Sequence, residues 1–343
     1  MNVRKSSPAG GIIARGRASA RALKAAVKVA RGPLARESRL VRAGIDRYEG
    51  ASGRSEAVYQ LRRHVHMLEK GLTMQPRRPL FGMDYIRSTV ETYVKLRASG
   101  AGSPLGREET SWMNSVLADY FDATRSAGDG DLAALETMFT AASLDGDDAR
   151  THGPHRPDLS PSPVVPADLL ALARNRRSVR WFDPRPVPRE IVDRAVEVGM
   201  EAPTACNRQP YRYLVFDEAE KVQRVAAVPM GTRGYAHQLT GIIVVVGDMS
   251  AFFDARDRHL IYIDGCLASM GLLLGLESEG VSSCVINWPD MPEKETEMRR
   301  LLGLGEHEKV IMLIAYGYAD PDGLVPFSAK GELDHVRSFP ELA

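Results

Sequence analysis

The sequence RRSVRWF occupies residues 176–182 of this 343-residue chain. Its polar side chains Arg176, Ser178 and Arg180 recur at every second position, so an extended segment projects all three to one side and Trp181 to the other. Two guanidinium groups and a hydroxyl are charge-assisted donors that suit a phosphate dianion better than a neutral ligand. Taken alone, this arginine strip (residues 176–182) fits a phosphate site and a solvated basic loop equally well.

A second motif, APTACNRQP, follows at residues 202–210, about one helix later. A proline stands near each end, which stiffens the loop and lowers the entropy that it loses on binding. The Thr204, Asn207 and Gln209 side chains can donate and accept hydrogen bonds, as the edge of a planar heterocycle such as a flavin requires. The presence of this bracketed loop (residues 202–210) indicates that both motifs belong to a binding site.

Together the two motifs resemble the FMN-dependent nitroreductase family, whose FMN-contacting segments are similar to RRSxRxF and APSxxNxQPW. This chain departs mildly from that pattern, with Thr204 where Ser is frequent and Tyr211 where Trp is frequent. The resemblance extends through GIIVVVG at residues 241–247, the helix-like run at 258–288 and KVIMLIAYGYADP at 309–321. Because the segments occur in the family's order over roughly 175 residues, the combined signal is specific although each segment alone is weak.

The resemblance implies a bound FMN and roles for residues of both motifs. Arg180 would lie near the N1 and O2 edge of the flavin and tune it, because a cation there stabilises the reduced ring. No other catalytic side chain is expected, since the cofactor carries the reaction. The resemblance places three further groups of residues at the FMN. The phosphate and ribityl oxygens would be bound by Arg176, Arg177, Ser178 and Lys330. A partner subunit would contribute Pro203, Thr204 and Asn207, and a turn would direct backbone N–H groups towards N5 from Cys284, Val285, Ile286 and Asn287.

The implied activity is FMN-dependent reduction of an electron-poor organic acceptor by NAD(P)H in a ping-pong mechanism. The acceptor stays open among nitro compounds, quinones, enones and a dedicated metabolite. The sequence has no GxGxxG fingerprint, so the nicotinamide would bind transiently over the flavin. Two alternatives remain: a specialised flavin enzyme on the same fold (a dehalogenase, an azoline dehydrogenase or an FMN-consuming enzyme), and a catalytically idle flavin-binding or partner-docking protein.

Family members are homodimers with FMN sites at the subunit interface, so the resemblance also implies a homodimer here. The run CLASMGLLLGL at residues 266–276 has small side chains that would let a matching helix of a second subunit approach closely. The same pattern suits an ordinary buried helix. Asp264 and several small residues make a core helix a better interpretation of residues 260–276 than a membrane span.

Charge is distributed unevenly along the chain. Residues 1–47 hold twelve Lys or Arg and two acids, whereas the rest is acidic and the formal net charge is only +1. This basic head (residues 1–48) is expected to be flexible, and two alternatives are weak contact with an anionic membrane or polysaccharide and an organellar targeting peptide. Three cysteines without a CxxC pair indicate a reducing compartment, so we expect a cytoplasmic protein, peripheral to the membrane at most. We expect no nucleic-acid partner.

Residues 49–142 are expected to form a helical extension. The run YQLRRHVHMLEKGL places Leu61, Val65 and Leu68 on one stripe of a helix, which Gly71 should end. His64 and His66 point about 200° apart on a helix and do not share a metal ion easily, so no metal is predicted. Residues 143–166 contain five prolines and almost no apolar side chains, as a linker does.

Residues 167–343 alternate helix and strand patterns. Helices are expected at 169–174, 191–200 and 260–276, and strands at 213–216, 242–246, 281–286 and 310–316. The residues themselves predict an α/β (α+β) domain with a mixed sheet flanked by helices. The resemblance makes this sheet nitroreductase-like and the extension before it an all-α addition.

Overall fold

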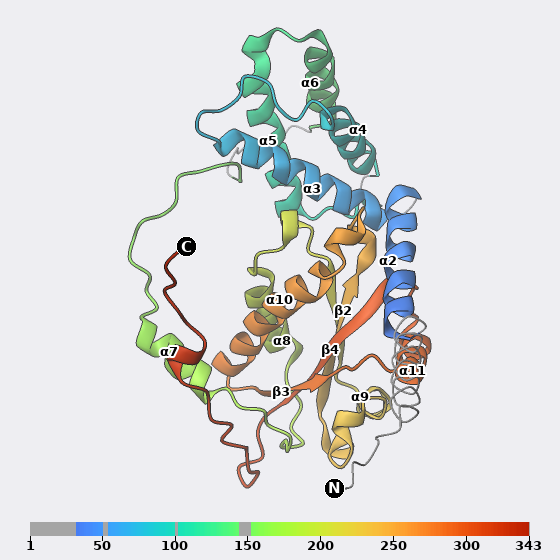
Figure 1. The fold of residues 1–343 in the computed structure, drawn as a ribbon, viewed down its shortest axis with the longest axis vertical. Helices are drawn as coiled ribbons and strands as arrows, with labels where there is room; N and C mark the ends of the chain where they lie inside the picture. The colour runs from blue at the N-terminus through green and yellow to red at the C-terminus, as the bar shows by residue number, and fades with distance from the viewer. Residues whose placement is uncertain (1–31, 51–53, 100–101, 144–151, 343) are drawn as a thin grey trace, which may run out of the picture.

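The computed structural model describes residues 32–50, 54–99, 102–143 and 152–342. These ranges form a helical extension followed by an α+β domain (Figure 1). The helices of the extension are α2 (Pro33–Gly50), α3 (Arg54–Thr73), α4 (Ile86–Arg97), α5 (Arg107–Thr124) and α6 (Gly130–Ala142). The predicted linker, residues 143–166, contains no helix or strand from residue 152 to 165, and its last residue, Pro166, already begins a helix.

Helices α3 to α6 share an apolar core of their own. The predicted stripe of α3 is confirmed, because Leu61, Val65 and Leu68 are fully buried in this core. Gly71 does not end the helix as expected, since α3 continues to Thr73. The absence of a side chain at Gly71 instead leaves room for the ring of Phe81, which packs directly against it.

Helix α2 overturns part of the prediction for the basic head. Leu40 and Val41 are buried in a cluster with Phe252 of the α+β domain, so the expected flexible head is wrong for residues 33–48. The helix lies so close to that domain that a Cβ at Gly44 would stand 2.6 Å from the Met249 carbonyl oxygen. Apolar and small residues four apart make this contact possible despite the basic composition. Residues 1–31 of the predicted head lie outside the described residues.

The sheet of the α+β domain contains four strands in the described residues. They are β1 (Tyr211–Phe216), β2 (Gly241–Asp248), β3 (Ser282–Asn287) and β4 (Glu308–Gly317), in the order β1-β2-β4-β3. All of the strand pairs are antiparallel. The named strands are therefore not mixed in direction as predicted, and the parallel bridge between Ser178 and Ser283 lies outside them. The α+β fold class is confirmed, because helices flank this antiparallel sheet.

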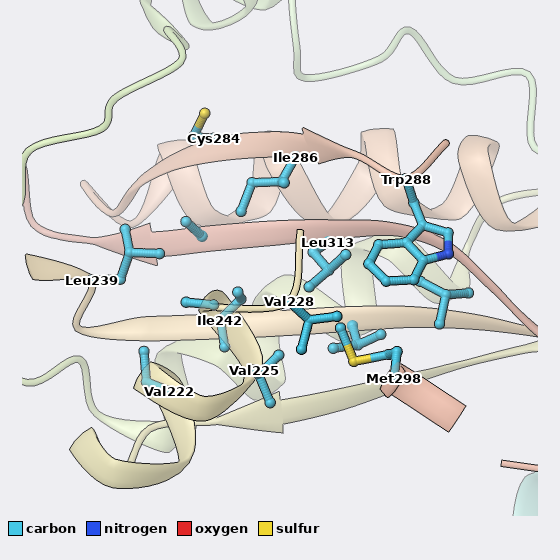
Figure 2. Close-up of a cluster of buried hydrophobic side chains, with 14 of the residues drawn as sticks. Val222, Val225, Val228, Leu239, Ile242, Cys284, Ile286, Trp288, Met298 and Leu313 are labelled. Atoms are coloured by element: carbon cyan, nitrogen blue, oxygen red, sulfur yellow. The ribbon is translucent and has the colours of Figure 1, made fainter. Parts of the chain in front are cut away.

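Both faces of the sheet are covered, which explains the unbroken apolar run of β2. Ile242 and Val244 face a core shared with α9 (Ala219–Ala226) and α11 (Pro292–Leu302). Figure 2 shows this core, where side chains from both helices gather beside the sheet. Ile243 and Val245 face the opposite core, formed with α8 (Arg189–Met200) and α10 (Leu260–Ser278).

The small residues of α10 pack against α8 of the same chain. A Cβ at Gly275 would lie 2.8 Å from the Ala195 Cα, and one at Gly271 would lie 2.9 Å from the Val198 carbonyl oxygen. Residues 255–278 are long and apolar enough to cross a membrane, yet half of that stretch is buried in the protein. The small-residue pattern therefore serves a buried helix within one chain, the second of the two interpretations.

Candidate flavin site

The arginine strip runs from the end of α7 (Pro166–Asn175) along the edge of β3. The Val179 N–H donates to the Ser283 carbonyl at 3.1 Å, and the Val179 side chain is buried in the core. The side-chain amide of Gln238 then bonds both the Arg180 carbonyl and, at 2.8 Å, the Phe182 N–H. Bonds to the backbone thus fix the strip and do not involve the arginine side chains.

The alternation predicted for the strip stops after Arg180. Phe182 is the second buried apolar residue of the strip, whereas Trp181 is 43% exposed and does not face the core with Val179. The cause is local, because Gln238 bonds on both sides of Trp181 and the chain leaves the β3 edge there. Sequence reasoning missed Gln238, which lies 56 residues beyond the strip.

The guanidinium groups of the strip have no carboxylate partner within ion-pair distance among the described residues. Arg177 donates to the Phe327 carbonyl at 3.0 Å, and Arg180 makes a long contact, 3.4 Å, to the Ser178 carbonyl. Arg176 lies near Glu277, whose pKa is raised by burial and lowered in part by this arginine. Three cations that form no close ion pair within the described residues suit a phosphate group, which supplies negative charge. The residues present therefore fit the phosphate end of FMN.

Arg180 also lies near the Tyr235 hydroxyl and the thiol of Cys284, which belongs to β3. Burial raises the pKa of the Tyr235 hydroxyl, and a hydrogen bond with Arg180 acts against this rise. Burial likewise raises the pKa of the Cys284 thiol, with Arg180 again opposing. The thiol therefore stays protonated near neutral pH, which argues against a nucleophilic cysteine at this place.

The C-terminal segment brings Lys330 towards the strip. Arg177 lies over the Phe327 ring at 5.8 Å as well as bonding its carbonyl, so this segment runs beside the strip. Lys330 follows three residues later, which limits its Cα to about 10 Å from that of Phe327. Its side chain is exposed. The contact with Arg177 therefore places Phe327 beside the strip, whereas the place of Lys330 at the FMN stays a prediction.

The segment from Cys284 to Asn287 is not the predicted turn. These residues belong to strand β3 and pair with β4. Cys284 and Ile286 are buried, whereas Val285 and Asn287 are exposed, because side chains alternate between the faces of a strand. Strand β3 is the edge of the sheet, so some of its N–H groups still face away from β4.

The bracketed loop has an unusual backbone. Cys206, Asn207 and Gln209 have φ values of 54°, 51° and 53°, in the left-handed region that L-residues other than glycine seldom adopt. The Gln209 N–H donates to Thr204 Oγ1 at 3.2 Å, and the Gln209 side-chain amide donates to Asn207 Oδ1 at 3.1 Å. Pro203 is exposed at the start of the loop. Such strain is concentrated at functional sites, where the surrounding structure enforces it.

A buried carboxylate holds the loop to α10. Asp264 Oδ2 accepts a hydrogen bond from the Ala205 N–H at 3.1 Å, and only 2% of the Asp264 residue is exposed. Burial raises the pKa of Asp264, while the bond from Ala205 and the charge of Arg208 oppose the rise. Sequence reasoning used Asp264 only against a membrane span and missed this role. An acid inside an apolar helix was the available signal.

The strip and the loop lie at opposite ends of α10. The loop is bonded to Asp264 near the N-terminus of this helix, and the strip approaches Glu277 near its C-terminus. At 1.5 Å per residue these two positions are about 20 Å apart. One chain therefore does not bring Thr204 and Asn207 next to the arginine strip.

The histidines of α3 form no metal site. His66 Nδ1 lies 3.4 Å from Glu69 Oε2, whereas the His64 ring lies against that of Tyr85, tilted by 34°, with centroids 5.1 Å apart. Burial, together with Arg63 and a further nearby arginine, lowers the pKa of His64 to about 4. In the part of the chain that the structure describes, no group of three metal-ligating side chains occurs.

Comparison with known proteins agrees with this architecture. Residues 173–232 and 231–318 match the model of the Nitroreductase family. A Methanothermobacter thermautotrophicus protein, provisionally named NADH dehydrogenase/NAD(P)H nitroreductase, is 26% identical over 157 residues, which cover 45% of this chain and 79% of that protein. Human iodotyrosine deiodinase 1 is 21% identical over 49% of this chain and 67% of its own length.

Solved structures are similar over the same half. An FMN-dependent nitroreductase of Clostridium difficile, 19% identical, aligns with 51% of this chain and 99% of its own, with a TM-score of 0.43. The resemblance predicted from the sequence is confirmed by the family match. The match to the Nitroreductase family model is confined to residues 173–318, and the helical extension lies outside the matched region.

Proposed function

We propose that this protein binds FMN at the arginine strip and uses NAD(P)H to reduce an electron-poor organic acceptor. One observation carries the proposal. Three guanidinium groups project from a backbone segment that β3 and Gln238 fix, and none of them forms an ion pair with a carboxylate of the described residues. The family match and the oxidoreductase names of the relatives support it.

The residues of the strip would divide the FMN between them. Arg176, Arg177, Ser178 and Lys330 would bind the phosphate and ribityl oxygens, and Arg180 would face the pyrimidine edge of the ring. When bound, FMN would supply reversible hydride acceptance, which no amino-acid side chain offers. The charge of Arg180 would favour the reduced ring, since reduction places negative charge near the N1 edge. Exposed N–H groups of Val285 and Asn287 remain candidates for N5.

A homodimer would complete the site. Ile263, Leu267 and Met270 form an apolar stripe on α10 that is 43–50% exposed. If two such helices pack antiparallel through this stripe, the loop of one subunit meets the strip of the other, because the two motifs occupy opposite ends of α10. Pro203, Thr204 and Asn207 would then come from the partner subunit. The stripe, rather than the small residues, would form this contact.

Substrates would react in alternation at one position. We propose that NAD(P)H occupies the open face over the flavin and leaves before the acceptor enters, in ping-pong order. Reductive dehalogenation is the favoured second candidate, because four of the curated relatives are iodotyrosine deiodinases, 20–22% identical over about half of the chain. A halogenated phenol therefore belongs beside quinones and nitro compounds in any screen.

Steady-state kinetics test the proposed function. Oxidation of NADH and NADPH is followed with a quinone, a nitroaromatic and an iodophenol as acceptors. Turnover with parallel double-reciprocal lines is expected for ping-pong order. Bound flavin that neither nicotinamide reduces would contradict the enzymatic role and support the catalytically idle alternative.

A further inference from the structure

Helix α3 of the extension contacts the bracketed loop directly. Arg62 Nη1 donates a hydrogen bond to the Arg208 carbonyl oxygen at 3.1 Å. The same guanidinium forms an ion pair with Glu109 of α5, and both of these side chains are only 18% exposed. Arg62 is therefore held on one side by the core of the extension and on the other by the loop. The two halves of the chain meet at this contact.

The loop residue that Arg62 contacts is anchored from its other side too. The Arg208 residue is 3% exposed, and its guanidinium carbon lies 4.9 Å from the centre of the Phe252 ring. The Arg208 Nη1 lies 3.8 Å from Asp257 Oδ2, while its Nε has no hydrogen-bond partner. This side chain is thus buried by packing rather than by a complete set of hydrogen bonds.

The anchored residue occupies a particular place in the strained backbone. Arg208 has right-handed dihedrals, φ −72° and ψ −30°, between Asn207 and Gln209, whose φ values are 51° and 53°. Each reversal of hand is unfavourable for an L-residue and persists only where other contacts impose it. The Arg208 carbonyl belongs to the peptide group that joins Arg208 to Gln209, so a hydrogen bond to this carbonyl restrains the backbone where its hand changes. Removal of that bond should let the loop relax.

We propose that Arg62 is a positioning residue of the flavin site, through which the helical extension holds Thr204 and Asn207 in their binding conformation. The inference rests on the proposed function for its consequence, since those two residues are expected to contact FMN. The extension lies outside the region matched by the family, so the family match does not account for this contact. Loss of the support lowers FMN affinity without any change in the arginine strip.

Two readouts on the full chain test this inference. Hydrogen–deuterium exchange of the FMN-free protein reports the amides of residues 204–209, and titration with FMN reports affinity. Arg62→Ala should speed exchange in the loop about 10-fold and weaken FMN binding by a similar factor, as expected for one charge-assisted hydrogen bond. Arg125→Ala is the matched control, because Arg125 pairs with Glu136 on the exposed side of the extension. It should leave both readouts unchanged.

Glu109→Gln provides a second variant if Arg62→Ala fails to fold. It keeps the Arg62 side chain but removes its ionic partner, so a smaller change in the same direction, about 3-fold, is expected. Loop exchange equal to that of the wild type in the folded variants would overturn the inference. A wild-type protein that binds no FMN would instead overturn the proposed function, while the exchange data would still decide the role of Arg62. Faster exchange throughout the extension would indicate a general structural role and would contradict the proposal.

Discussion

The arginine strip and the bracketed loop differ in which part of the chain is held by the rest of the protein. In the strip, backbone bonds to Ser283 and Gln238 fix an ordinary extended chain, and the charged side chains remain available. In the loop, Asn207 and Gln209 side chains bond to one another, and a strained backbone is held by Asp264 and Arg62. The strip presents charged side chains on an unstrained backbone, whereas the loop has a strained backbone conformation that neighbouring residues hold.

This contrast shows why the two motifs should respond differently to substitution. Changes in the strip should alter ligand binding and leave the fold intact, because the side chains make few internal contacts. Changes around the loop should alter stability and binding together, since the same contacts hold the backbone. Substitutions in the strip and around the loop test whether the two motifs differ in this way.

Arg180→Ala should have the largest effect. Loss of a cation that faces the FMN should weaken FMN binding about 100-fold, or roughly 2.7 kcal/mol, and slow flavin reduction by NAD(P)H. The thermal midpoint of the FMN-free protein should hardly change. Fluorescence titration and stopped-flow absorbance measure the two effects. Arg185→Ala is the control, because Arg185 stacks on Tyr318 at 3.6 Å and lies outside the strip. Unchanged binding and reduction in Arg180→Ala would remove this residue from its proposed role.

Asp264→Ala should act on both stability and binding. The substitution leaves the Ala205 N–H without its acceptor in a buried place, which costs about 1–3 kcal/mol of unfolding free energy. FMN affinity should fall about 10-fold because the loop loses its tie to α10. Asp264→Asn keeps an oxygen acceptor and should stay close to the wild type in denaturant unfolding. If the alanine variant lost affinity but no stability, the distinction between strip and loop would be wrong.

The pH dependence of the free energy of unfolding should reveal the buried, cationic environment of His64 beside the loop. The pKa of His64 is lowered to about 4 by burial and by Arg63 and Arg208, against about 6.5 in the unfolded chain. Between these values the unfolded chain binds a proton that the folded chain does not, so stability falls as the pH is lowered from 6.5 to 4. The loss should be on the order of 2 kcal/mol.

His64→Gln isolates this contribution, because other groups titrate in both proteins. Urea unfolding at pH 7, 6 and 5 should show a shallower decline for the variant than for the wild type. Parallel declines in the two proteins would mean that His64 is not held in its neutral form.

Glycine substitutions should give the smallest effects and opposite signs. Cys206→Gly removes the steric cost of φ 54° and should stabilise the protein by about 1 kcal/mol. Ser178→Gly in the extended strip should destabilise by about the same amount, because glycine there only adds entropy to the unfolded chain. Thermal unfolding of the FMN-free protein measures both. Destabilisation of similar size at both positions would show that the loop is not strained.

The sequence was sufficient for the features that repeat regularly. Alternating or helically spaced apolar residues located the strands, the core helices and the stripe of α3, and motif order located the strip and the loop. The same spacing could not distinguish contact within a chain from contact between chains. The small residues of α10 accordingly proved to pack on α8.

Contacts between distant segments were not predictable from the sequence. Helix α2 appeared to be part of a flexible basic head, because its buried face depends on Met249 and Phe252 two hundred residues away. Gln238, Asp264 and Arg62 support the two motifs from other elements, and only Asp264, an acid inside an apolar helix, is marked by its local sequence. The positive φ values of the loop likewise arise from tertiary contacts rather than from glycine.

Release of the bound cofactor tests the central claim most directly. The protein is purified without added flavin, its visible spectrum is recorded, and the supernatant is analysed by chromatography after denaturation. The account predicts an oxidised-flavin spectrum and about one FMN per chain, with no FAD. Colourless protein that also takes up no FMN when incubated with an excess of it would contradict the account.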